Sequence, residues 1–331
     1  MSTIKRIQWI DQVKGFAILT VVYGHNFPIL EKYIYSFHMP LFFFLAGMFH
    51  PKDVNILTIK KRAKQLLIPY FIWSILLYLF WLILGRYYGD PTKLELSSLK
   101  NFIGVFYSQG DRVYMDWGIP MWFLPCIFLV FCIFLLINTI EKKHITLIAI
   151  ISSFIVGVTI SNYSSYSYFW SFDIALVAIS FYSCGFFLKK KIINYNQKGM
   201  ILVLLFLFTI NITCLLYNSK IDMYRSNYGN PMLFFIGGMT GSLFWILFFK
   251  SVNYFKFLAF LGKNTIIILA THLRVSTFIK LILIIILSKY SSSFNEFDKI
   301  LMTTLQIIFL IPIINLINKK LPILNGKIQS K

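Results

Sequence analysis

Apolar runs long enough to cross a lipid bilayer recur through the whole chain. A helix needs about 20 predominantly apolar residues to span the hydrocarbon core, where every backbone amide must be bonded internally. Ten runs can be placed, with approximate bounds 13–31, 37–50, 66–85, 120–138, 145–161, 172–188, 200–217, 231–249, 264–287 and 300–318. The sequence therefore predicts an all-α polytopic integral membrane protein, a bundle of about ten transmembrane helices.

Composition and charge agree with this fold class. The chain is 58% hydrophobic and 13% charged, whereas a soluble domain carries about a quarter charged residues. The net charge of +20 does not indicate nucleic acid, because the lysines fall in alternate connections, as the positive-inside bias requires. We expect both termini in the cytoplasm and a single integral-membrane domain over residues 1–331, without a soluble appended domain.

Several common chemistries are excluded by their missing motifs. The sequence contains no P-loop, GxGxxG, HExxH or GxSxG pattern, which argues against nucleotide-driven pumps and most soluble enzyme classes. The four cysteines are scattered in apolar runs without a CxxC pair, so neither disulfides nor a metal site is expected.

Ionisable side chains interrupt the first two apolar runs, where lipid makes charge costly. Asp11 and Lys14 are three residues apart and share a helix face. Lys14 and His25 are close to three full turns apart, with a rise of about 16 Å between them. A helical hairpin would bring His25 and His38 to similar depth within the membrane. These residues form a titratable stripe in which His25 is a candidate general base and Asp11 a candidate partner of Lys14 or Arg6.

The ninth apolar run carries a further imidazole. His272 lies a little over two turns after Asn264, and Arg274 and Lys280 follow it. These charges make a break or bend near His272 our expectation. A structural role and a catalytic role are both open for this histidine.

A basic cluster precedes the third apolar run. It consists of Lys60, Lys61, Arg62 and Lys64. Two interpretations are equally open. The cluster is ordinary positive-inside charge, or it is a cytoplasmic binding site for a phosphate-rich donor, which cations hold by charge-assisted hydrogen bonds.

The longest connection runs from residue 86 to about residue 119. It holds Trp117 and several charged residues, and it is either functional or a simple tether. Trp117, with Tyr166 and Trp170 of a later connection, is a candidate for stacking on a sugar; an interfacial aromatic belt is the alternative.

Several motifs of the sequence resemble those of a known family. The opening DQVKGFAILTVVYGH and the following FHMPLFFFLAG are similar to the membrane-bound acyltransferase family 3. The later blocks KRAKQLLIPY, MWFL and LGKNTIIILATH support the same resemblance, which covers essentially the whole chain. Within that family the chain looks like the fucose 4-O-acetylase-like group of bacterial sugar O-acetyltransferases.

The resemblance implies a reaction and its residues. It implies acetyl transfer from cytoplasmic acetyl-CoA to a sugar hydroxyl of a surface or capsular polysaccharide, or of its lipid-linked precursor, at a bacterial plasma membrane and without a metal. His25 would be the catalytic base or acyl carrier, and Lys14 would support it or the donor. The family often has an Arg-x-x-Arg pair before the third span; here Arg62 matches the first place and Gln65 occupies the second.

The candidate site residues fall into three groups. The catalytic candidates are His25, Lys14, His38, Asp11 and His272. The candidates for binding acetyl-CoA are Lys14, Lys61, Arg62, Lys64 and Tyr70. The candidates for binding the acceptor are Trp117, Trp122, Asn264 and Arg274.

Two other classes of protein also fit a multi-span chain with buried ionisable residues. One is a transporter or flippase for a glycan or small polar substrate, in which those residues form the path. The other is a glycan-binding membrane scaffold without turnover. The missing inverted repeat and the scarcity of Asp and Glu in the apolar runs favour the enzyme.

Overall fold

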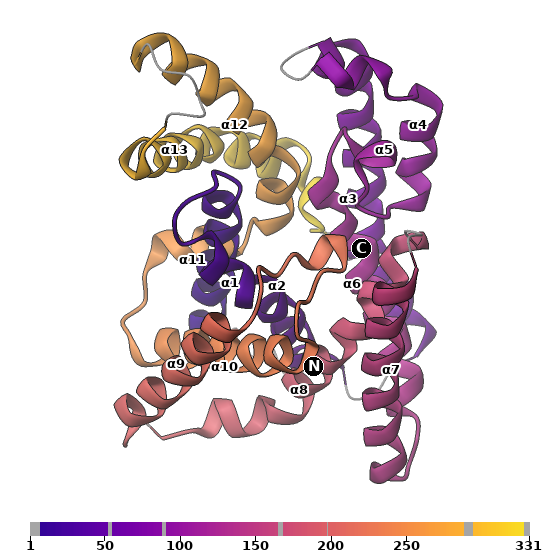
Figure 1. The fold of residues 1–331 in the computed structure, drawn as a ribbon, viewed down its shortest axis with the longest axis vertical. Helices are drawn as coiled ribbons and strands as arrows, with labels where there is room; N and C mark the ends of the chain where they lie inside the picture. Colours follow the sequence, from indigo (N-terminus) through magenta and orange to yellow (C-terminus); the bar gives the residue numbers. More distant parts are fainter. Residues whose placement is uncertain are drawn as a thin grey trace. The chain divides into compact units, whose positions relative to one another are not determined.

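A computed structural model describes residues 7–51, 55–87, 91–164, 168–196, 198–287 and 294–327. Within these ranges every regular element is helical (Figure 1). The α-helices are α1 (Gln8–Gly24), α2 (Glu31–Met48), α3 (Ile56–Ile83), α4 (Ser98–Tyr107), α5 (Arg112–Met115), α6 (Phe123–Asn138), α7 (Lys143–Tyr163), α8 (Phe172–Asn194), α9 (Met200–Tyr217), α10 (Pro231–Ser251), α11 (Lys256–Gly262), α12 (Thr265–Leu287) and α13 (Glu296–Lys320). The short 3-10 helices are η1 (Gly85–Tyr87), η2 (Pro91–Glu95), η3 (Ile119–Trp122), η4 (Phe169–Ser171), η5 (Met223–Arg225) and η7 (Pro322–Asn325).

Eight helical segments of the described chain are long and apolar enough to cross a membrane. They are α3, α6 with η3, α7, α8 with η4, α9, α10, α12 and α13. The predicted all-α polytopic membrane protein is therefore confirmed. The count of ten includes α1 and α2, which have 17 and 18 residues and do not belong to these eight, so that count stays a prediction.

The bounds of the first predicted span were wrong. The helix covers Gln8–Gly24 rather than 13–31, and His25 is its C-cap residue instead of lying deep inside a helix. The backbone of Phe27 is left-handed, with φ 53°, and Pro28 disfavours a helical conformation of the residue before it. Both features end α1 at the histidine.

The ninth predicted span was correct in its bounds; the helix has no break at His272, and the alternative of a bend stays a prediction. α12 runs from Thr265 to Leu287 as one helix through His272. Hydrogen bonds from the His272 ring to carbonyls of its own helix let an imidazole be buried there without interrupting the backbone.

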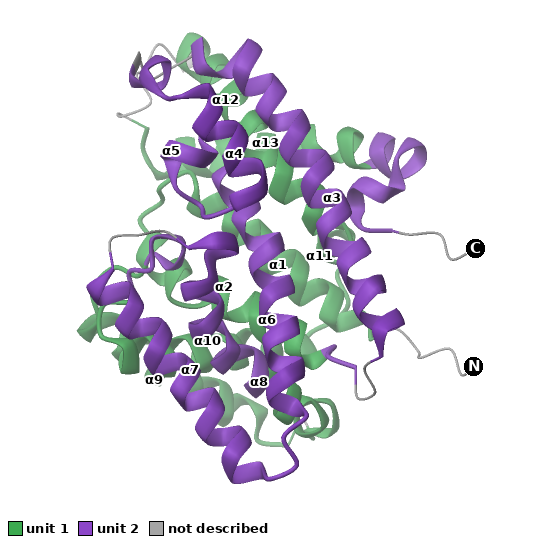
Figure 2. Cartoon of the chain, turned by 90° about the vertical axis from the view of Figure 1, so that its right-hand side faces the viewer, with its two compact units in different colours: residues 1–48, 185–221, 228–314 green, residues 49–184, 222–227, 315–331 purple. Residues whose placement is uncertain are grey.

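The chain is organised as two compact units, each built from segments distant in sequence (Figure 2). Unit 1 comprises residues 1–48, 185–221 and 228–314, and unit 2 comprises residues 49–184, 222–227 and 315–331.

Unit 1 is held by close helix contacts and an aromatic core. Gly15 of α1 lies against the Leu258 carbonyl of α11, where a Cβ would overlap the backbone, so only glycine allows this approach. The next residue, Phe16, packs on two aromatic rings. Its ring centroid lies 4.1 Å from that of Trp245 on α10 and 6.2 Å from that of Phe37 on α2. These contacts fix α1, the helix that ends at His25, against three neighbours.

Unit 2 is organised around α3, which places three buried aromatic side chains against other segments of the same unit. The Tyr70 hydroxyl donates to the Val105 carbonyl at 2.8 Å, and the Trp73 indole donates to the Leu324 carbonyl at 2.9 Å. The Trp81 indole donates to Asp116 at 2.7 Å. The connection after residue 86 is thus folded, with η2, α4 and α5 in it, rather than an irregular tether.

Candidate functional site

Three histidines gather in unit 1 where α1, α2 and α12 meet. The ring of His25 packs against that of His272, with centroids 5.1 Å apart and planes inclined by 35°. His38 and Lys280 lie near enough to His25 to act on it electrostatically. The structure thus brings together the three imidazoles that the sequence placed on separate apolar runs.

Two of the three imidazoles have a defined tautomer. Nδ1 of His38 lies 2.8 Å from the Ile34 carbonyl, and Nδ1 of His272 lies 2.9 Å from the Ile268 carbonyl. A carbonyl oxygen only accepts hydrogen bonds, so Nδ1 carries the proton in both rings. In the neutral form Nε2 then keeps its lone pair and can take a proton. Nε2 of His272 is buried with no hydrogen-bond partner among the described residues.

The other predicted residues of unit 1 lie along the same helices. On α1, Asp11 is buried about four turns before His25, and Lys14 is half-buried about three turns before it. Asn264 is buried just before α12 and donates to the Phe260 carbonyl at 2.7 Å. Arg274 is half-buried two residues after His272 and acts on it electrostatically. Arg6, the alternative partner proposed for Asp11, lies outside the described residues, as does Tyr166.

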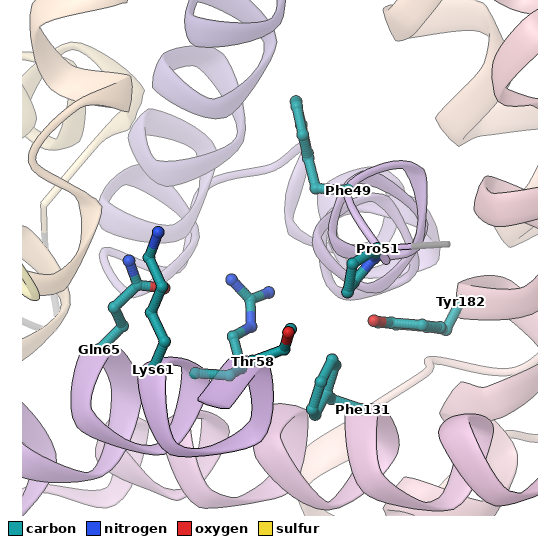
Figure 3. A pocket seen from close by; sticks show the side chains of 8 residues that line it. Phe49, Pro51, Thr58, Lys61, Gln65, Phe131 and Tyr182 are labelled. Carbon is teal, nitrogen blue, oxygen red and sulfur yellow. The ribbon is translucent and has the colours of Figure 1, made fainter. Parts of the chain in front are cut away.

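A separate pocket lies within unit 2, at the start of α3. Its cavity measures about 150 Å³ and is lined by Phe49, Pro51, Thr58, Lys61, Arg62, Gln65, Phe131 and Tyr182. In Figure 3, Lys61 and Gln65 extend from one helix while the Tyr182 hydroxyl points into the pocket from the opposite side. A drug-sized ligand needs about 300–1,000 Å³, so this cavity suits a single group of a larger molecule.

The charge in this pocket comes from Lys61 and Arg62. The Arg62 guanidinium lies 6.0 Å from the centre of the Phe131 ring, and its Nε is buried with no hydrogen-bond partner in the part of the chain that the structure describes. None of the ion pairs found between described residues involves Arg62. A desolvated guanidinium of this kind is suited to a phosphate or carboxylate.

A histidine behind the pocket orients its phenol. Nδ1 of His50 lies 2.9 Å from the Tyr182 hydroxyl, and the His50 ring packs between Phe131 and Phe134. Burial, and to a smaller extent the Arg62 charge, lower the pKa of His50 to about 4. His50 is therefore neutral at physiological pH, and the pocket's positive charge is that of Lys61 and Arg62.

The remaining predicted residues of unit 2 lie elsewhere. Lys64 is exposed and does not line the pocket. Tyr70 is fully buried, and its hydroxyl donates to the Val105 carbonyl. Trp117 is fully buried and donates to the Asn101 carbonyl at 2.9 Å. Trp122 is buried too. Their roles in binding donor or acceptor stay predictions.

Sequence reasoning missed two groups of polar residues. Tyr182 of α8, with His50 bonded to it, comes to the pocket of Arg62 only through tertiary folding, whereas Thr58 lies one turn from Arg62 on α3. Thr303 and Gln306, three apart in an apolar run, bond Asn26 beside His25. The second group left a signal: polar residues on one face of an apolar helix need partners.

The fold and the comparison with known proteins together identify the protein's class and family. The fold defines the class, a polytopic helical membrane protein. A family model described as an acyltransferase domain matches residues 7–317, nearly the whole chain. The chain therefore belongs to the acyltransferase 3 family and is a membrane acyltransferase. No curated protein and no solved structure matches it.

Proposed function

We propose that this acyltransferase moves an acetyl group from acetyl-CoA to a sugar hydroxyl of a surface or capsular polysaccharide, or of its lipid-linked precursor, in a bacterial plasma membrane. The observation that carries the proposal is the packing of His25 against His272, 5.1 Å between ring centres, in a chain of this family. It supplies a proton acceptor inside a helical membrane protein, where acyl transfer to an alcohol requires one.

The reaction begins when the His25 imidazole takes the proton of the acceptor hydroxyl. The oxygen attacks the thioester carbonyl carbon, the C–S bond breaks, and the CoA thiolate takes the proton back from the imidazolium. The Lys280 ammonium, which acts on His25 electrostatically, is a candidate to stabilise negative charge on the carbonyl oxygen in the transition state.

A second route uses His25 as the acyl carrier. Its unprotonated ring nitrogen attacks the thioester carbonyl carbon, the C–S bond breaks, and the thiolate takes the proton of the other ring nitrogen, which leaves CoA thiol and an acyl-imidazole. The acceptor hydroxyl then attacks the acyl carbon and the C–N bond breaks; Nε2 of His272 or His38 takes the hydroxyl proton and passes it to the departing His25 ring, since both rings hold their own proton on Nδ1.

The donor's phosphates would bind at the pocket of unit 2. Lys61 and Arg62 supply charge, while Thr58, Gln65 and Tyr182 supply hydrogen-bonding groups around one cavity. The cavity volume of about 150 Å³ suits one phosphate-bearing part of CoA. Lys14, Lys64 and Tyr70, and the acceptor residues Trp117, Trp122, Asn264 and Arg274, remain further candidates.

The test is acetyl transfer in membranes that contain the chain. Acetyl-CoA labelled in its acetyl group is added with the glycan fraction of the cells that naturally produce the protein, and the glycan is analysed by mass spectrometry. We expect one acetyl mass per modified sugar, and loss of it in the His25→Ala variant. Glycan movement across the membrane without labelling would replace this proposal by transport. Full labelling by His25→Ala would refute the role of His25.

A further inference from the structure

The residue after His25 is tied to α13 by a buried amide. Asn26 is 4% exposed and lies in the turn between α1 and α2. Its Nδ2 donates to the Thr303 hydroxyl at 2.7 Å, and its Oδ1 accepts from Gln306 Nε2 at 3.2 Å. Thr303 and Gln306 are three residues apart on α13 and share a face. We call these three side chains the Asn26 clamp.

The hydrogens of the clamp allow only one arrangement. The Thr303 hydroxyl donates its single proton to the Lys299 carbonyl at 2.8 Å, so towards Asn26 it can only accept. Asn26 must therefore present its NH₂ group to Thr303, which leaves its oxygen for Gln306. All three side chains are buried, so each lost hydrogen bond would leave an unsatisfied polar group.

The turn held by the clamp is one that the backbone alone does not favour. Phe27 adopts a left-handed conformation, φ 53°, which is unfavourable for a non-glycine residue. Its side chain is 61% exposed, so packing of the phenyl ring does not hold it there. The Phe27 amide donates to the Gly24 carbonyl at 3.1 Å, and the buried side-chain bonds of the preceding Asn26 anchor the same turn to α13.

The clamp also acts next to the imidazole pair. His25 and Asn26 are consecutive, and His25 faces His272 of α12. Ile279 and Leu283 of α12 share one buried hydrophobic cluster with Met302 of α13 and with Phe294, which precedes α13. The helix that carries His272 is thus packed on the helix that anchors Asn26. The same helix pair therefore positions the rings of both His25 and His272.

We propose that Asn26 is a positioning residue, which Thr303 and Gln306 hold so that His25 is presented to its substrate in a single orientation. This inference rests on the proposed function, because it assigns His25 the reacting group. A positioning role for Asn26 does not change the reaction class. It identifies the residues that determine where the His25 imidazole lies.

The test compares matched substitutions on α13. Thr303→Val removes the hydroxyl at similar volume, and Thr303→Ser keeps it. Thr304→Val is the control, because Thr304 is the next residue, is exposed, and donates to the Ile300 carbonyl in the same way. With acetyl-CoA and the glycan fraction as substrates, we expect Thr303→Val to lower kcat about tenfold, since small misplacements of a reacting group are costly, with KM for acetyl-CoA unchanged.

Two further readouts separate positioning from mere stability. The pH profile of kcat should shift in Thr303→Val and return in Thr303→Ser. The rate at which diethyl pyrocarbonate modifies His25, followed by mass spectrometry, should change in Thr303→Val and not in Thr304→Val. This second readout needs no turnover.

The outcomes distinguish the two proposals. If His25→Ala is fully active, the proposed function fails whatever the clamp does. If His25→Ala is inactive while Thr303→Val keeps the wild-type kcat, pH profile and His25 modification rate, the positioning role alone is overturned. A loss of kcat that is equal in Thr303→Val and Thr303→Ser also overturns it, because the hydroxyl would then be irrelevant.

Discussion

The three histidines of unit 1 and the cationic pocket of unit 2 differ in how their polar side chains are bonded and charged. In unit 1, His38 and His272 each bond one ring nitrogen to a carbonyl of their own helix, so in the neutral ring the other nitrogen keeps a lone pair that can take a proton. In unit 2, Arg62 keeps its charge while Phe131 covers it and no described carboxylate neutralises it. The first arrangement suits proton transfer, and the second suits holding an anion.

The largest effect expected from this difference is on catalysis at His25. His25→Ala should lower kcat by roughly 10²–10⁴-fold, the usual contribution of a general base, and leave the affinity for acetyl-CoA unchanged. Transfer rates and equilibrium binding of acetyl-CoA measure the two separately. His144→Ala, an exposed histidine on α7, is the control. A weaker donor affinity with unchanged kcat would reverse the roles given to the two units.

The next largest effect concerns the donor pocket. Arg62→Ala should raise KM for acetyl-CoA about 10–100-fold, since a hydrogen bond to a charged group contributes roughly 1.5–3 kcal/mol, with kcat little changed. Lys60→Ala is the matched control, because Lys60 belongs to the same basic run but does not line the pocket. Equal changes in both variants would mean that the cluster acts only as diffuse positive charge.

A smaller effect is expected from the pocket's phenol. Tyr182→Phe removes the hydroxyl that bonds His50 at 2.9 Å and should raise KM for acetyl-CoA a few-fold, in line with a neutral hydrogen bond of about 1 kcal/mol. Tyr163→Phe alters an exposed tyrosine of the same unit and should leave KM at the wild-type value. A wild-type KM in Tyr182→Phe would remove the phenol from donor binding.

The last effect concerns stability instead of activity: the stability of the protein should depend on pH through His50 of unit 2. Burial lowers the pKa of His50 to about 4, whereas in an unfolded chain it is about 6.5. Between these values the unfolded chain binds a proton that the folded chain does not, so stability is full above about pH 6.5 and falls as the pH drops toward 4.

Thermal unfolding of the detergent-solubilised protein between pH 7 and 4.5 measures this loss. His50→Gln should flatten the decline in Tm, while His144→Gln, at an exposed position, should not. An unchanged slope in His50→Gln would show that another group dominates.

Much of the fold could be predicted from the sequence, because in lipid a long apolar run must be a helix. The third, ninth and tenth predicted runs all fall on membrane-length helices, α3, α12 and α13. The end of α1 could not be predicted in this way. Apolar residues continue past His25, and only the turn at Phe27 and Pro28 shows that the helix stops there.

The candidate sites were predicted less completely. The motifs singled out His25, which interrupts an apolar run, and Arg62, which belongs to a basic run before the third span. His50, Tyr182 and Asn26 did not stand out, because each is an ordinary polar residue near a helix end or in an apolar run. Their importance depends on partners more than 100 residues away in the chain, which no local pattern contains.

The sequence by itself determined that this chain is a helical membrane protein of the acyltransferase 3 family, with His25 in its opening motif. Only the tertiary structure decided which groups surround that histidine. The physical reason is that hydrophobicity is a property of each segment alone, whereas the packing of His25 on His272 and the orientation of Asn26 are set by atoms that folding brings from distant segments.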